Sequence, residues 1–548
     1  MIISIKPTKV TSMLARTQNT ILSAALVISL ASAANAILGF VKSRLLASYF
    51  GVSHDLAIFY TADKIPNLIY SVLVVGALST VFIPVFTAKL KENKEDAFKT
   101  ASSIISATVG FFLVIGSLIF IFTEPLLNLI SLGRFTPEEM NLGVNLMRIM
   151  IVSQVFLVGG SLITSVLQSF KYFLIPALAP VVYNLGMIAG IVFLSPTQGI
   201  YGPTWGVLLG TLLYLGIQVP LVAKTGFRYS SRLDFRDKGL RETLKLVPPR
   251  LISVFMANVM GTVNNSLAIL VSTSSVVFLK FATQLQTFPV TLFGLSIAAA
   301  SLPTLSETTH ENNFEKFKKT FTTSFHQTMF LVIPLSVILL VLRVPVVRIV
   351  YGVSNFPWEA TVQTSYILAF FSISIFAQSA NYLITRAFYA LKDTKTPVLI
   401  NTVTVLLNIG FSVLFVVVLK LGVWAVALSF SATAILDMIL YLYFLAKKTG
   451  GFVWVEFLRP FVKISYAALF MGVTLYLPLK LLDQFIFDTT RTIELLALTA
   501  VAGVIGVTTY LVLTKLFRVA EIELFYKIMR KLKLMKSPVP APISENIN

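Results

Sequence analysis

The chain has 548 residues, of which 56% are hydrophobic and only 12% are charged, and its mean hydropathy is +0.84. These values exceed what a soluble core of any size needs, so they exclude a soluble globular protein and indicate an integral membrane protein. The net charge of +20 mainly reflects the loops that membrane proteins keep in the cytoplasm, so we expect no nucleic-acid partner. The sequence contains no cysteine, which excludes disulfides and thiolate metal sites.

Apolar stretches long enough to cross the hydrocarbon core as a helix recur along the whole chain, and we count about fourteen of them. Their approximate starts are Leu22, Ile65, Ile104, Val144, Phe173, Trp205, Leu251, Val277, Phe325, Tyr366, Val398, Trp424, Val462 and Leu495. The expected fold class is therefore an all-α integral membrane protein with about 14 transmembrane helices.

The first stretch has two interpretations. Lys6, Lys9 and Arg16 precede it, as in a cleaved signal peptide. However, its apolar residues continue through Phe40, which is too long for a signal-peptide core. We therefore predict a retained spanning helix, and a signal peptide is the alternative.

The orientation follows from the loops that collect Lys and Arg. Four lysines lie between Lys89 and Lys99, and seven basic residues lie between Lys224 and Lys245, so both loops should be cytoplasmic. Alternation from these loops places both termini in the cytoplasm. The tail from Lys515 to Lys536 alternates basic and apolar residues, as expected for a helix on an anionic membrane surface, and the final segment is expected to be disordered.

Two sets of residues recur in the same order. Pro84, Glu92, Asn93, Phe98 and Lys99 return 219 positions later (303 − 84) as Pro303, Glu311, Asn312, Phe317 and Lys318. Leu162, Ile163, Thr164, Lys171 and Pro176 return 221 positions later (397 − 176) as Leu383, Ile384, Thr385, Lys392 and Pro397. This pattern predicts an internal duplication.

Six predicted spans separate the copies, and an even number keeps both copies in the same orientation. The repeat therefore predicts two parallel six-helix lobes around a cleft, as in an alternating-access transporter; a duplicated but merely stable bundle is the alternative. The predicted parts are an N-terminal lobe (1–223), a basic linker (224–245), a C-terminal lobe (246–450), two further helices (451–516) and a tail (517–548).

Charged and amide side chains within the spans are the candidate site residues, because they are costly in a membrane. Lys42 and Arg44 end the first span on its external side, where they line the cleft or reach the lipid headgroups. Lys64 begins the second span next to Asp63, and Lys280 lies one helical turn before Gln284. Asn264 and Asn265 line the cleft or bond helices together.

The run from Asp63 to Tyr70 (DKIPNLIY), followed by Gly76–Ser79 and Phe82–Phe86, resembles the second helix of the MurJ (MviN) lipid II flippases of the MOP exporter superfamily. Leu302–Ser306 and Arg386–Ala390 also fit this family. The resemblance implies a cleft lined by the first, second, seventh and eighth helices, with a groove for the lipid tail on the last two. The substrate would be the undecaprenyl-pyrophosphate-linked peptidoglycan precursor, moved from the inner to the outer leaflet.

Several charged positions of the family are altered in this chain. Ala36, Tyr70 and Gln284 stand where the resemblance leads us to expect arginines, Lys42 replaces another, and Ala57 replaces an aspartate. Nearby charges could substitute for them: Arg44, Asp55 and Lys280. A lysine offers a pyrophosphate a point charge without the bidentate fork of arginine, so affinity could fall while attraction remains.

Two other functions stay open. An exporter of another polyprenyl-linked oligosaccharide or amphiphile would share the architecture. A glycosyltransferase would need a catalytic loop with carboxylates, but the longest loop is basic. We expect a monomer that interacts with membrane lipids and needs no cofactor, driven by the membrane potential or by sodium. Few sodium ligands are available: Asn401, Asn408 and Asp437.

Overall fold

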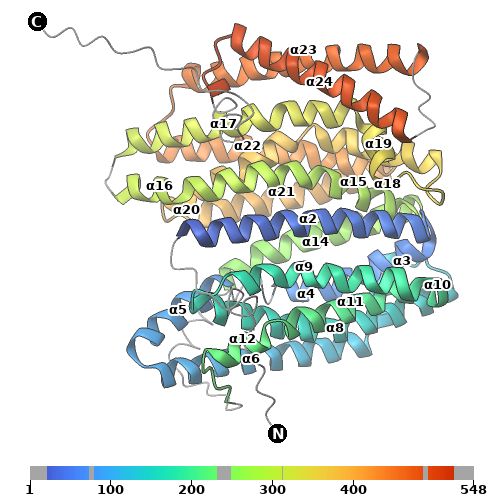
Figure 1. Ribbon diagram of the computed structural model, residues 1–548, viewed down its shortest axis with the longest axis vertical. Helices are drawn as coiled ribbons and strands as arrows, with labels where there is room; N and C mark the ends of the chain where they lie inside the picture. The colour runs from blue at the N-terminus through green and yellow to red at the C-terminus, as the bar shows by residue number, and fades with distance from the viewer. Residues whose placement is uncertain are drawn as a thin grey trace, which may run out of the picture. The chain divides into compact units, whose positions relative to one another are not determined.

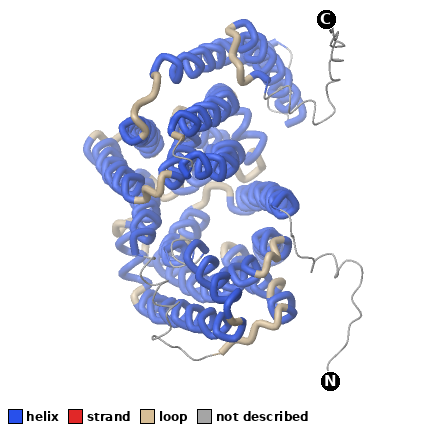
Figure 2. Tube along the Cα trace, turned by 90° about the vertical axis from the view of Figure 1, so that its left-hand side faces the viewer, coloured by secondary structure: helices blue, strands red, loops and turns tan. Residues whose placement is uncertain are grey.

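The computed structural model describes residues 21–72, 74, 79–230, 248–310, 313–485 and 492–523, and the regular structure of these residues is helical (Figure 2). The helices of the N-terminal part are α2 (Ile21–Phe50), α3 (His54–Ala62), α4 (Lys64–Tyr70), α5 (Ser79–Glu92), α6 (Lys94–Ile121), α7 (Thr123–Ser131), α8 (Pro137–Ser169), α9 (Leu174–Ala189), the π-helix η2 (Gly190–Leu194), α10 (Ser195–Gln198), α11 (Tyr201–Gly216) and α12 (Val219–Lys224) (Figure 1). The later helices are α14 (Pro248–Val271), α15 (Ser275–Pro289), η3 (Val290–Leu295), α16 (Ser296–His310), α17 (Phe314–Val341), α18 (Arg343–Tyr351), α19 (Trp358–Ser372), α20 (Ile375–Ala390), α21 (Lys395–Val413), η4 (Leu414–Val418), α22 (Trp424–Lys448), α23 (Trp454–Phe485) and α24 (Thr492–Leu516).

Within these ranges, 12 helices are long and apolar enough to cross a membrane, or 13 if α19 and α20, which meet at a 45° bend, form one span. Every predicted span except the second corresponds to one of them. The second predicted span, which starts near Ile65, includes residues 73 and 75–78 that lie outside the described part. The all-helical membrane fold class is therefore confirmed, with 12 to 13 candidate spans among the described residues.

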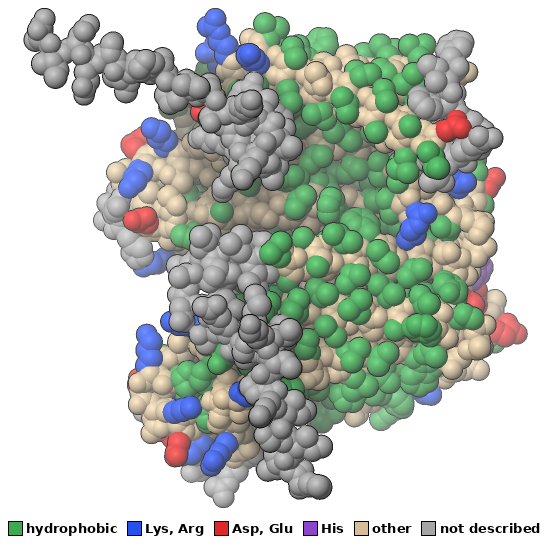
Figure 3. Space-filling view, viewed as in Figure 1, with side chains coloured by type: hydrophobic (Ala, Val, Ile, Leu, Met, Phe, Trp, Pro, Cys, Tyr) green, Lys and Arg blue, Asp and Glu red, His purple; other side chains and the backbone are tan. Residues whose placement is uncertain are grey.

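Side-chain chemistry explains where the spans begin and end. Asn93 caps α6 by accepting a hydrogen bond from the backbone N–H of Glu95, at 2.9 Å, and acidic residues occupy the first turn, where they favour the positive end of the helix dipole. Figure 3 shows hydrophobic side chains over α8, α9 and α11, whereas Lys and Arg gather beside α5 and α6. The apolar surface therefore belongs to the middle of the helices and the charge to their ends.

The internal repeat recurs in the helices themselves. A 28-residue helix followed by a 9-residue helix occurs as α6 and α7, and again as α17 and α18. Both long helices start with an asparagine cap, Asn93 in the first copy and Asn313 in the second, although the sequence repeat pairs Asn93 with Asn312. Phe98 and Phe317, which the repeat does pair, are both buried.

The second repeated set forms the same backbone turn twice. Lys171 (φ 63°) and Lys392 (φ 57°) both adopt the left-handed conformation, which is rare for residues other than glycine. In each copy the next N–H reaches back five residues, from Tyr172 to the Leu167 carbonyl and from Asp393 to the Phe388 carbonyl, both at 3.0 Å. These are Schellman turns, which satisfy the last carbonyls of a helix.

The described helices pack into two compact units. The first consists of residues up to Gln284 together with Val350–Ile367 and Asn401–Thr433, and the second of Leu285–Ile349, Leu368–Ile400 and the C-terminal part from Ala434. The predicted lobes are defined by the sequence repeat rather than by packing, so their boundaries stay predictions. The predicted linker and tail lie mostly outside the described residues.

The first unit contains an unusually close helix pair, α9–η2 against α11, which lie side by side in Figure 1. A Cβ atom on Gly190 would lie 2.4 Å from the Gly206 Cα, and one on Gly186 would lie 2.5 Å from the Gly210 Cα. Only glycine permits this approach. Small residues at four-residue spacing let membrane helices pack backbone to backbone. We call these four residues the glycine interface.

The second unit is built around α17, which packs against α16, α20 and α23. Its core is rich in phenylalanine, and Phe317, Phe321 and Phe325 occupy successive turns of one face of α17. Aromatic contacts continue this core to α23, where the rings of Phe325 and Phe457 lie 4.7 Å apart. The start of α23 is therefore held firmly against the start of α17.

Candidate functional site

Three lysines and one aspartate of the first unit form the strongest candidate site. Lys42 comes from α2, Lys64 from the start of α4 and Lys280 from α15, while Asp63 lies at the junction of α3 and α4. Lys42 and Lys64 both lie within electrostatic reach of Lys280 and of Asp63. We call these four residues the lysine cluster.

The lysine side chains are held by long contacts. The Lys280 ammonium lies 5.5 Å from the centroid of the Tyr60 ring, a cation–π arrangement, and Lys280 itself is exposed. The Lys64 ammonium donates to the Gly261 carbonyl of α14 at 3.5 Å, the outer limit of a hydrogen bond. Both ammonium groups therefore keep most of their capacity to donate to a ligand.

The charge balance of the lysine cluster favours an anionic ligand. Three ammonium groups face a single carboxylate, and Lys42 and Lys64 are half-buried. Like charges that lose water raise each other's energy, and an anion with several oxygens would relieve this cost. The cluster residues come from α2, the α3–α4 junction and α15, and α14 adds the Gly261 carbonyl that Lys64 contacts. These segments belong to the first, second, eighth and seventh predicted spans.

Arg44 does not join the lysine cluster. Two residues on a helix are about 200° apart, so Lys42 and Arg44 point to opposite sides of α2. The Arg44 guanidinium donates to the Val350 carbonyl at 2.9 Å, and the side chain is exposed. Arg44 therefore links α2 to the last turn of α18, and it is a poor substitute for a lost arginine in the cluster.

Asp55 is also distant from the other candidates. It lies exposed in the first turn of α3, whereas Asp63 follows the last turn. Eight residues of helix separate the two carboxylates by about 12 Å along the axis. Asp55 therefore lies at the other end of α3 from the lysine cluster.

Gln284 bonds the helices together. The Ser43 hydroxyl donates to its Oε1 at 2.5 Å, and its Nε2 donates to the Gly39 carbonyl at 3.1 Å. Both partners belong to α2, so this amide fastens α15 to α2. Lys280 and Gln284, which the sequence places on one face of α15, thus have different partners, Tyr60 and α2.

The asparagines of α14 also bond helices together. Asn265 donates to the Thr61 hydroxyl of α3 at 3.2 Å, and Asn264 donates to the Asn408 Oδ1 of α21 at 3.3 Å. Asn408 in turn donates to the Thr433 hydroxyl of α22 at 3.2 Å. Asn264, Asn265 and Asn408 are buried, which supports the interhelical alternative over cavity lining.

Two of the candidate sodium ligands are bonded to other side chains. Asn408 donates to the Thr433 hydroxyl at 3.2 Å, and the Asp437 Oδ2 accepts from Asn381 at 3.1 Å. In the described part of the chain, no three His, Asp or Glu side chains gather in a way that could hold a metal ion. Sodium coupling therefore stays a prediction.

Three residues near the lysine cluster did not follow from the sequence. Tyr60 lies three positions before Asp63, a spacing that places both on one helix face, so periodicity could have found it. Ser43 lies between the charged residues Lys42 and Arg44, and a single serine within a span is no sequence signal of its own. Tyr183 of α9 lies within electrostatic reach of Asp63, and no local pattern signals this contact.

Comparison with known proteins identifies the family. The model of the family described as lipid II flippase MurJ matches residues 46–494. The chain belongs to the MurJ family. A protein of Buchnera aphidicola subsp. Acyrthosiphon pisum, named a probable lipid II flippase MurJ, is 27% identical over 510 residues, which cover 91% of this chain and 98% of the relative.

The solved structures agree with this assignment. A lipid II flippase MurJ described as an inward closed conformation matches with a TM-score of 0.76 and 27% identity, covering 93% of this chain and 100% of that one. A multidrug resistance transporter of the MATE family in the MOP superfamily matches with a TM-score of 0.64 and 13% identity, over 76% of this chain and 94% of that one. The second likeness shows the shared fold. The predictions of a MurJ-family membrane transporter with the MOP fold are confirmed.

Proposed function

We propose that this protein moves lipid II from the inner to the outer leaflet by alternating access, and that the lysine cluster holds the pyrophosphate of the substrate. The observation that carries this proposal is the meeting of Lys42, Lys64 and Lys280 around Asp63 in a chain of the MurJ family. A pyrophosphate carries several anionic oxygens, and each ammonium group can donate up to three hydrogen bonds.

The cluster residues have distinct roles in this proposal. Lys64 and Lys280 turn from their long contacts with Gly261 and Tyr60 toward the phosphate oxygens. Asp63 limits the excess of positive charge while the site is empty. Because lysine lacks the planar fork of arginine, the site attracts the pyrophosphate by charge more than by fixed geometry, which suits a ligand that must also leave.

The lipid tail needs a surface of its own. α23 and α24 pack against each other, and both expose large apolar side chains, among them Val455 and Leu469 on α23 and Val504 on α24. We place the polyprenyl tail along this pair, as expected for residues 451–516. The remaining features of the proposal are a monomer in the cytoplasmic membrane, both termini in the cytoplasm, and drive from the membrane potential.

The test is replacement of the native lipid II flippase in a bacterium depleted of it. Expression of this protein should restore growth and should expose lipid II to a probe added outside the cytoplasmic membrane. The double variant Lys42→Ala/Lys280→Ala should insert normally but restore neither. Lys395→Ala/Lys447→Ala is the matched control, because it removes two lysines that are exposed at helix ends.

The outcomes separate the parts of the proposal. If the wild-type protein inserts but lipid II stays on the inner leaflet, lipid II is not its substrate. If Lys42→Ala/Lys280→Ala transports as well as the wild type, the lysine cluster is not the pyrophosphate site.

A further inference from the structure

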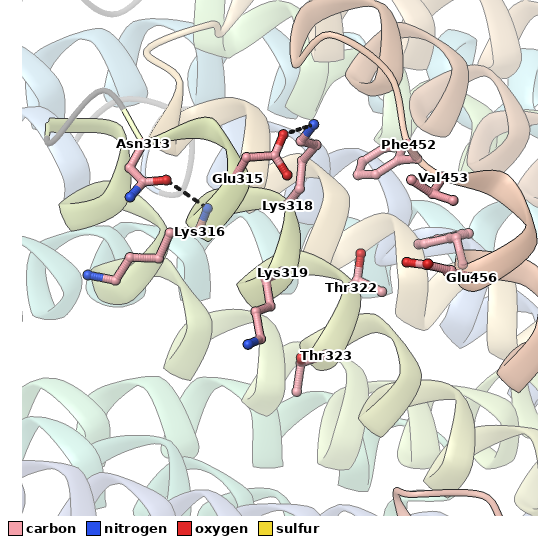
Figure 4. A pocket seen from close by; sticks show the side chains of 11 residues that line it. Asn313, Glu315, Lys316, Lys318, Lys319, Thr322, Thr323, Phe452, Val453 and Glu456 are labelled. Atoms are coloured by element: carbon pink, nitrogen blue, oxygen red, sulfur yellow. Dashed lines mark hydrogen bonds and ion pairs between the residues drawn. The ribbon is translucent and has the colours of Figure 1, made fainter.

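A polar pocket lies in the second compact unit, where α17 and α23 begin. Its volume is about 670 Å³. It is lined by Asn313, Glu315, Lys316, Lys318, Lys319, Thr322 and Thr323 from the α17 side and by Phe452, Val453, Glu456 and Phe457 from the α23 side. Figure 4 shows Lys316, Lys319 and Thr323 toward one side of the pocket and Phe452, Val453 and Glu456 toward the other. It shares no residue with the lysine cluster.

The polar side of the pocket carries an excess of positive charge. Three lysines face two glutamates, and one of the lysines, Lys318, pairs with Glu315 at 2.5 Å. Lys319 is exposed, and Thr322 and Thr323 add hydroxyl donors beside it. Ammonium and hydroxyl groups within one pocket match the oxygens of a phosphate.

The opposite wall is largely apolar, although Glu456 also lies on it, and its aromatic rings are packed into the core. Val453 is 64% exposed, so it presents a hydrophobic surface to its surroundings. Phe452 stacks on Phe321 with ring centroids 5.6 Å apart, and Phe457 is buried in the aromatic core. A free phosphate ion has no apolar surface to bury against this wall, whereas the glycerol and upper acyl carbons of a lipid would pack against it.

The pocket also lies at the level of lipid headgroups. Both adjoining helices become spans here, since the candidate spans are Phe314–Val341 and Trp454–Leu482. Trp454 is 43% exposed, as is typical of aromatic residues at the membrane interface. On the predicted orientation this end faces the cytoplasmic leaflet, whose anionic lipids attract basic segments.

We propose that this pocket binds the headgroup of an anionic phospholipid. The lipid phosphate accepts hydrogen bonds from the ammonium groups of Lys316 and Lys319 and from the hydroxyl groups of Thr322 and Thr323. The acyl chains extend past Phe452 and Val453. The bound lipid fastens the start of α23 to α17. It is a ligand additional to the transported substrate, so the proposal does not depend on which lipid the protein flips.

The test measures which lipids the purified full-length protein retains, by native mass spectrometry after reconstitution with equal amounts of phosphatidylglycerol and phosphatidylcholine. The wild type should retain phosphatidylglycerol preferentially. Lys316→Gln/Lys319→Gln should lower its retention at least fivefold. The matched control is Lys91→Gln/Lys99→Gln, which removes two exposed lysines near the first repeat copy and should retain the lipid as the wild type does.

Two further arms identify the ligand. Val453→Asp should lower phosphatidylglycerol retention, because it places a carboxylate against the acyl chains. Millimolar inorganic phosphate should not displace the lipid. Displacement by phosphate, together with unchanged retention in Val453→Asp, would assign the pocket to a free anion and overturn the proposal. Equal losses in both lysine pairs, or no preference for phosphatidylglycerol, would show diffuse surface attraction and would also overturn it.

Discussion

The glycine interface and the lysine cluster are both part of the first compact unit, but they are held in opposite ways. At the glycine interface, backbones approach so closely that a Cβ on Gly190 would lie 2.4 Å from the Gly206 Cα. In the lysine cluster, the charged groups rest on contacts of 3.5 and 5.5 Å. The glycine interface accepts no side chain larger than glycine, whereas the ammonium groups of the lysine cluster can still donate hydrogen bonds to a ligand.

This difference suggests that the two regions have different roles in transport. A transporter needs helices that move as rigid bodies and a site whose side chains can exchange one partner for another. Close backbone packing supplies rigidity because it depends on many short contacts. Weakly held ammonium groups allow the site to bind and release a ligand, because only weak contacts break when these groups turn toward it. The following substitutions test this contrast, from the largest expected effect to the smallest.

Gly206→Leu should have the largest effect. A Cβ at this position would already lie 2.9 Å from the Met187 carbonyl oxygen, and backbone cannot shift aside as a side chain can. We expect destabilisation at or above the upper end of the about 1–3 kcal/mol typical of overpacking. Thermal unfolding in detergent and the yield of monodisperse protein measure it. Gly216→Leu in the same helix is the control, because nothing lies within 4 Å of its Cβ position. Equal losses in both variants would contradict the close packing.

Lys280→Ala should impair binding but leave the fold intact. Removal of one of three ammonium groups should weaken lipid II binding about tenfold, equivalent to about 1.4 kcal/mol. Lys280→Arg should restore affinity, because guanidinium keeps the charge and adds a fork. Binding of lipid II to the purified protein, measured at low and at high salt, is the readout. An unchanged affinity in Lys280→Ala would remove this residue from the site.

Ser43→Ala tests the bond that fastens α2 to α15. It leaves the Gln284 Oε1 without the Ser43 hydroxyl, and loss of one such hydrogen bond costs about 1 kcal/mol. We expect a small loss of stability with near-normal lipid II binding. A double-mutant cycle with Gln284→Leu isolates the coupling. Strictly additive effects of the two substitutions would show that the pair contributes nothing jointly.

Asp393→Asn should have the smallest effect, since it concerns a paired charge outside the spans. Burial alone would raise the pKa of Asp393, but hydrogen bonds from Lys448, at 2.5 Å, and from the backbone and side chain of Thr396 outweigh it and lower the pKa to about 2. A lowered pKa adds stability above the ordinary value of 3.8, and this stability is lost as the pH falls toward 2.

The wild type should therefore lose more stability than Asp393→Asn between pH 4 and pH 2, and the two should have parallel profiles above pH 5. Unfolding midpoints across this pH range measure the difference. Identical profiles would show that the pair with Lys448 adds nothing. The stability that this paired carboxylate contributes could then be compared with that of Asp63 in the lysine cluster, where three lysines surround one carboxylate.

The sequence predicted features that depend on local order along the chain. Span lengths and positions follow from apolar stretches, because the thickness of the hydrocarbon core sets the length of a helix. The repeat paired Lys171 with Lys392, and the structure gives both residues the same left-handed turn, since equal local sequences satisfy the end of a helix in the same way. The resemblance in the Asp63–Tyr70 run pointed to the MurJ family, which the match over residues 46–494 confirms.

Only the tertiary structure decided which of the charged residues meet. Lys42 reaches Lys280 and Asp63, whereas Arg44 turns to Val350, although both were candidates from the same short segment. The glycine interface was equally hidden, because its residues look like ordinary glycines until α9 and α11 are brought together. The physical reason is common to both: periodicity along a helix tells which residues share a face, but the partner of that face depends on how separate helices pack.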